Sequence, residues 1–177
     1  KKIGDAGVQI LFEGLKRGAL PKLRNLFLCE IELGPAGAEV LAAAFRRGAM
    51  PKVEKVQLGD NKRLSNQGLA ALSPVLRKLP SLQGLYLGNI NIDDEGMDSL
   101  LTDLGTNDFK ALEEISLEEN SWTASGIATL IRAIKHRAMP ALKEVELDNG
   151  FDDFDAEFGV TSAHQVAVRN ALAARSN

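Results

Sequence analysis

The sequence is poor in cysteine, in aromatic residues and in long apolar runs. Its single cysteine, Cys29, cannot form a disulfide within one chain. One Trp and one Tyr among 177 residues leave few rings for stacking on bases, and a formal net charge of −3 gives no general attraction to nucleic acid. No stretch reaches the roughly 18 apolar residues of a membrane span. We therefore expect no nucleic acid partner, no membrane insertion and an intracellular, cytoplasmic location.

A repeated aliphatic pattern runs through most of the chain. The pattern LxxLxL, in which L is any aliphatic residue, recurs every 29 or 30 residues and begins at Leu23, Val53, Leu82, Leu112 and Leu142. Its alternation is typical of a strand with one buried face. The pattern predicts five strands, at residues 23–28, 53–58, 82–87, 112–117 and 142–147.

A second motif, GxxxLxxxL, precedes the first strand and separates the others. Its members are Gly7-Leu11-Leu15, Gly37-Leu41-Phe45, Gly68-Leu72-Leu76, Gly96-Leu100-Leu104 and Gly126-Leu130-Ile134. Spacings of four and eight residues place these groups on one helical face. Three residues before each glycine stands a residue type favoured as a helix N-cap: Gly4, Gly34, Ser65, Asp93 or Thr123. Each unit is therefore predicted to be a strand followed by a helix, with a final helix at 161–174.

The five units resemble the leucine-rich repeat family, in its long-repeat, ribonuclease-inhibitor-like subclass, which also includes Ran GTPase-activating proteins and the sensor arms of NOD-like receptors. The resemblance implies an α/β solenoid, a horseshoe with a parallel concave sheet and convex helices. One departure concerns the ninth repeat position, where the subclass uses Asn or Cys to bond the turn. This chain has Ile31, Asn61, Ile90, Asn120 and Gly150 there. We expect irregular turns at Ile31 and Ile90, because isoleucine cannot form such a bond.

The two ends differ from the repeats between them. Residues 1–150 are predicted to be leucine-rich repeats, and we expect them to be the C-terminal part of a longer array because the first helix has no strand before it. Residues 151–177 are predicted to be a capping loop and helix, with Phe151, Phe154 and Phe158 covering the core. The alternative is a functional acidic loop. It resembles a calcium-binding EF-hand loop only in composition, since Asp153 and Gly159 replace the required Gly and Glu.

No catalytic, cofactor or metal motif is present in the sequence. His136 and His164 do not have metal-ligand spacing, and Cys29 has no histidine nearby in the chain. No glycine-rich stretch matches a phosphate-binding loop. We therefore expect a protein that is not an enzyme, with no cofactor, no metal and no small-molecule substrate.

Within each LxxLxL unit the third, fifth and seventh residues point away from the core. Phe27 and Tyr86 are candidate apolar anchors in the first three units, whereas the last two units are acidic. We predict that this face binds a partner protein with a basic surface. The predicted binding residues are Asn25, Phe27, Lys55, Gln57, Tyr86, Glu114, Ser116, Glu118, Glu144, Glu146 and Asp148. The alternatives are a merely solvated face, a regulator of a small GTPase, and a structural subunit that contacts its neighbours through edges or helices.

Overall fold

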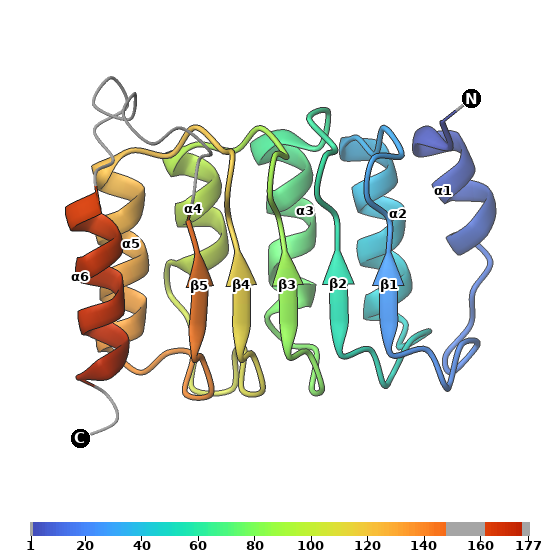
Figure 1. The fold of residues 1–177 in the computed structure, drawn as a ribbon. Coiled ribbons are helices and arrows are strands. Elements are labelled where there is room, and N and C mark those ends of the chain that lie inside the picture. Colours follow the sequence, from blue (N-terminus) through green and yellow to red (C-terminus); the bar gives the residue numbers. More distant parts are fainter. Residues whose placement is uncertain (1, 148–161, 175–177) are drawn as a thin grey trace.

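The computed structural model describes residues 2–147 and 162–174, which form a sheet layer and a helix layer (Figure 1). The sheet is parallel, with strand order β1-β2-β3-β4-β5. Its strands are β1 (Asn25–Phe27), β2 (Lys55–Gln57), β3 (Gly84–Tyr86), β4 (Glu114–Ser116) and β5 (Glu144–Glu146). The helices are α1 (Gly4–Phe12), α2 (Pro35–Arg46), α3 (Ser65–Leu76), α4 (Asp94–Leu101), α5 (Ala124–Lys135) and α6 (Ser162–Ala173). The prediction of alternating helices and parallel strands is confirmed.

The strands are shorter than the six-residue segments predicted from the pattern. Three residues of each unit pair in the ladder, and only the middle one, such as Val56, points into the core. The outer aliphatic residues, such as Val53 and Leu58, are buried although they lie beyond the paired residues. Leu58 still donates its backbone N–H to the Tyr86 carbonyl, at 3.0 Å. The ladder is short because the chain must turn at both ends of each strand to reach a helix.

The predicted buried helix faces are correct for α2, α3 and α5. The prediction is wrong for α1, which buries Val8 and Phe12 and leaves Leu11 54% exposed. α1 lies at one end of the helix layer and packs against α2 (Figure 1). Together with Ile3 and Ile10, Leu11 forms exposed apolar surface. α4 is also shorter than predicted, because it ends at Leu101, before Leu104.

The predicted caps at Gly34, Asp93 and Thr123 are confirmed. Gly4 and Ser65 are instead the first helical residues, each with a positive φ, and the caps fall on Ile3 and Leu64.

Two buried asparagines bond the turns that follow the strands. Asn61 donates to the carbonyls of Leu28, Leu58 and Gly59, and its Oδ1 accepts from the N–H groups of Ile31 and Leu33. Asn120 makes the equivalent five bonds one pair of repeats later, where it accepts from Ile90 and Ile92. The turns at Ile31 and Ile90 therefore do not lose their side-chain bond. Each receives it from the asparagine of the next repeat.

Carboxylates of one helix also accept hydrogen bonds from backbone N–H groups at the start of the next helix. Asp5 of α1 accepts from the N–H groups of Gly34 and Gly37 at the start of α2, at 2.6 and 3.1 Å. Asp94 of α4 does the same for Thr123 and Gly126 at the start of α5. Because these amides have no partner within their own helix, each carboxylate fixes the position of the next repeat.

One continuous apolar core lies between the two layers. Trp122, the only tryptophan, is fully buried in it and donates its indole N–H to the Leu117 carbonyl at 2.9 Å. In the described part of the chain, no helix is both long enough and apolar enough to span a membrane.

Candidate functional site: the open sheet face

The sheet side that faces away from the helices, called here the open sheet face, carries the predicted binding residues. Asn25, Phe27 and Glu144 are exposed on it. The half-buried residues are Lys55, Gln57, Tyr86, Glu114, Glu118 and Glu146. Ser116 is 1% exposed, and the strand register places the longer residues Tyr86 and Glu146 on either side of it. Asp148 lies outside the described residues, as do Phe151, Phe154 and Phe158 of the predicted cap.

Phe27 on the edge strand β1 is 59% exposed. The strand register places Gln57 beside it, followed by Tyr86, Ser116 and Glu146 in the same row. A large aromatic side chain that stays in water costs free energy which a partner recovers by covering it. Phe27 is therefore suited to be an apolar anchor.

Tyr86 is not a free aromatic anchor, because its hydroxyl is fixed between two charges. The Tyr86 hydroxyl donates to Glu114 Oε2 at 2.6 Å and accepts from Lys55 Nζ at 3.1 Å. The Lys55 ammonium also lies over the Tyr86 ring, 5.6 Å from its centroid. Burial and the bond to Glu114 raise the pKa of Tyr86, and the bond to Tyr86 raises the pKa of Lys55.

Gly84 makes room for this arrangement. It lies between Lys55 and Glu114 in the strand register. A Cβ at Gly84 would stand 2.9 Å from Cε2 of Tyr86, closer than real contacts allow. The missing side chain lets the ring fold down over the strand, so that one hydroxyl bridges strands that are not neighbours.

The acidic patch, defined as Glu114, Glu118, Glu144 and Glu146, covers β4 and β5. Register places Glu144 directly beside Glu114. Burial, followed by the charges of Glu118 and Glu114, raises the pKa of Glu146. Lys55 Nζ lies 4.0 Å from Glu114 Oε2, whereas Glu118, Glu144 and Glu146 form no ion pair with another described residue. The patch therefore holds uncompensated negative charge, which a cationic group would stabilise.

A small cavity of about 210 Å³ opens at the carboxyl ends of β1 to β4, beside the acidic patch. Its lining includes Cys29, Gly59, Gly88 and Glu118. A Cβ at Gly88 would lie 2.8 Å from Cγ of Glu118, so this glycine lets the glutamate lie along the sheet. Burial raises the pKa of the Cys29 thiol, which favours the unreactive protonated form. Among the described residues, no group of three or more His, Cys, Asp and Glu side chains is placed to hold a metal ion.

Sequence reasoning identified which residues share this face but missed how they interact. It did not predict that Tyr86 bridges Lys55 and Glu114, nor that Ser116 is buried. The only signal in the sequence was Gly84, which interrupts a column of larger residues.

Neither protein-family models nor curated proteins give a match to this chain. Solved structures do match. The structure described as leiomodin-1 actin-binding site 2 is 12% identical, covers 90% of this chain and 84% of its own length, and has a TM-score of 0.68. The C-terminal domain of Caenorhabditis elegans tropomodulin is 15% identical, covers 96% of this chain and 93% of its own length, and has a TM-score of 0.65.

The chain has a leucine-rich-repeat-like fold. This follows from the near-complete coverage of both neighbours, together with a parallel sheet that alternates with helices. At these identities the likeness concerns the fold alone.

Proposed function

We propose that this chain is a non-enzymatic protein-binding module, and that its open sheet face binds a basic segment of a partner protein. In the horseshoe of the ribonuclease-inhibitor-like subclass, this face is the concave one. The observation that carries the proposal is the acidic patch, in which three carboxylates form no ion pair with a described residue and the pKa of Glu146 is raised. An arriving Lys or Arg relieves that repulsion, while Phe27 supplies apolar contact at the other end of the face.

Charge reversal of the acidic patch tests this proposal. The variant Glu114→Lys/Glu144→Lys/Glu146→Lys is compared with a control that reverses three exposed carboxylates of the helix layer, Glu13, Glu39 and Glu95. Partners are captured from a lysate, purified, and measured for association at low and high salt. We expect the patch variant to slow association at least about tenfold and to remove most of its salt dependence, with little effect of the control. A partner that binds both variants like the unmodified chain contradicts the proposal.

A second candidate function is actin binding. The observation that favours it is the match to leiomodin-1 actin-binding site 2 across 90% of this chain. Co-sedimentation with filamentous actin, and its competition by the partner found above, distinguish this candidate. Regulation of a small GTPase and a structural role in an assembly stay open as alternatives, and a GTP hydrolysis assay separates the first of these.

A further inference from the structure

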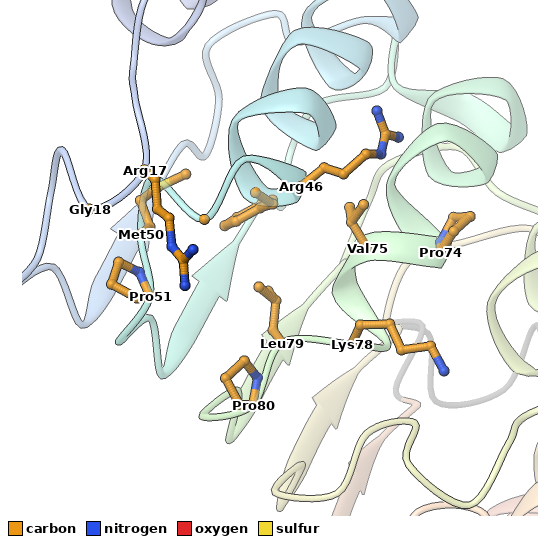
Figure 2. Close-up of a pocket in the computed structure, with 12 residues that line it drawn as sticks. Arg17, Gly18, Arg46, Met50, Pro51, Pro74, Val75, Lys78, Leu79 and Pro80 are labelled. Atoms are coloured by element: carbon orange, nitrogen blue, oxygen red, sulfur yellow. The ribbon is translucent and has the colours of Figure 1, made fainter.

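A second surface, on the helix side of the molecule, combines an apolar floor with a basic rim. The groove has a volume of about 590 Å³ and lies at the ends of α2 and α3 (Figure 2). Phe45, Met50 and Val75 form its floor and are 9% exposed or less. Pro51, Leu79 and Pro80, from the turns before β2 and β3, line the side nearest the sheet. This surface, called here the helix-end groove, does not include any residue of the open sheet face.

The third repeat is shortened where it lines the groove. In four repeats, five positions separate the last apolar residue of the helix motif from the apolar anchor before the strand, as from Phe45 to Met50. In the third repeat this separation is three, from Leu76 to Leu79. The Gly48-Ala49 pair of the second repeat therefore has no counterpart there.

The backbone contacts between neighbouring turns differ on the two sides of the second turn. The carbonyls of Gly48 and Ala49 accept from the N–H groups of Gly18 and Leu20, at 2.8 and 2.9 Å, and join the first turn to the second. Between residues 47–52 and 77–81, all of which the structure describes, no backbone hydrogen bond forms. The second and third turns are therefore not joined by backbone hydrogen bonds, and the groove lies between them.

The rim of the groove is cationic. Arg17 and Arg46 are exposed on it and form no ion pair with any described residue. Lys78 contributes its aliphatic stem, while its ammonium is paired with the Asp108 carboxylate. Figure 2 shows the Arg17 side chain beside Met50 and Pro51, and the Arg46 side chain extending from α2.

The charge around the groove continues along this edge of the molecule. The connections that lead into strands, residues 13–24, 47–54, 77–83, 102–113 and 136–143, contain eleven Lys and Arg and five Asp and Glu. The connections that leave strands, residues 28–34, 58–64, 87–93 and 117–123, contain two Lys and Arg and six Asp and Glu. The groove therefore opens on the basic edge, opposite the acidic one.

We propose that the helix-end groove docks an acidic peptide segment of a partner protein, with one or two apolar side chains on the floor and carboxylates against Arg17 and Arg46. The volume is within the range of natural ligand sites and suits a few side chains rather than a whole domain. The chemistry is opposite to that expected for the open sheet face, so the two surfaces bind different ligands.

Peptide selection on the intact chain tests this inference. A phage-displayed library of random twelve-residue peptides is selected on the unmodified protein, and the enriched peptides are measured by fluorescence anisotropy. We expect enrichment of peptides that combine Asp or Glu with Phe, Leu or Trp. Arg17→Glu and Arg46→Glu should each weaken their binding about fivefold or more, and Val75→Thr, which makes the floor polar at constant size, should also weaken it.

Matched controls make the test specific. Lys135→Glu reverses the charge at the last residue of α5, as Arg46→Glu does for α2, and should change affinity less than twofold. The Glu114→Lys/Glu144→Lys/Glu146→Lys variant should leave peptide affinity unchanged, which separates this result from the fate of the sheet-face proposal. Thermal unfolding confirms that each variant is folded. Enrichment of basic peptides, no enrichment, equal losses for Lys135→Glu and Arg46→Glu, or self-association of the chain through this groove would each overturn the inference.

Discussion

At the scale of single residues, a few polar side chains within an apolar array determine the geometry. Asn61 is 1% exposed and makes five hydrogen bonds to the backbone of two repeats. An alanine there would leave buried N–H and carbonyl groups without partners, and such groups cost more than the bond itself contributes. One side chain therefore serves two turns.

We predict that Asn61→Ala lowers the free energy of unfolding by about 3 kcal/mol. Urea denaturation measures this change, and hydrogen exchange should quicken at the amides of Ile31 and Leu33. Asn25→Ala is the control, because Asn25 is exposed on β1, has no side-chain hydrogen bond to another described residue and does not have a positive φ. Equal destabilisation by the two variants would show that Asn61 acts only as a surface residue does.

Glu146 makes the stability of the protein depend on pH. Its pKa in the folded protein is raised, so the folded state binds more protons than the unfolded state over the interval between the two pKa values. The stability that protonated Glu146 contributes is therefore lost as the pH rises through that interval. At neutral pH the ionised Glu146 opposes folding.

We predict that Glu146→Gln stabilises the protein at pH 7 and that the gain disappears as the pH falls below about 4.3, the usual pKa of glutamate. Thermal unfolding from pH 3.5 to 8 measures both effects. Glu119→Gln, an exposed neighbour of the same type, serves as the control. A gain that grows on acidification would show that the sign of this argument is wrong.

At the scale of helices and strands, α2 and α5 each depend on a carboxylate of the preceding helix at their N-terminal ends. The Asp94 carboxylate accepts from the Thr123 and Gly126 N–H groups and from the Thr123 hydroxyl, at 2.6–2.9 Å. These are the first amides of α5, which the helix itself cannot pair. α4 thus supplies a second side-chain cap of α5, in addition to that of Thr123.

We predict that Asp94→Ala costs about 1 kcal/mol and increases hydrogen exchange in the first turn of α5 more than in α4. Glu95→Ala removes the same charge from the same turn of α4 without touching α5, and should cost less. Exchange that increases equally in α4 and α5 would indicate a general charge effect instead of a cap.

At the scale of the whole molecule, a single core connects all the repeats. Each helix packs on its neighbour, and each strand pairs with the next. Stability in such an array is shared between adjacent units, so damage in one repeat reaches the others. Trp122 is fully buried between β4 and α5, several repeats away from α2, and its fluorescence reports on that coupling.

We predict that Leu41→Ala in α2 costs about 3 kcal/mol, because Leu41 is fully buried. The unfolding transition followed by Trp122 fluorescence should shift to lower denaturant together with the transition followed by circular dichroism. If Trp122 fluorescence keeps its original midpoint while the circular dichroism splits into two transitions, the repeats unfold independently.

The sequence by itself determined the repeat, the order of strands and helices, and the residues that share the open sheet face. It could do so because a periodic pattern of buried aliphatic residues is a local signal that is repeated five times. The tertiary structure alone decided how neighbouring repeats meet. Asn61 bonds the turn at Ile31, Tyr86 joins Lys55 to Glu114 over Gly84, and the helix-end groove forms between the second and third turns. These features pair residues about 30 positions apart, and their distances depend on how one repeat stacks on the next, which no pattern within a single repeat specifies.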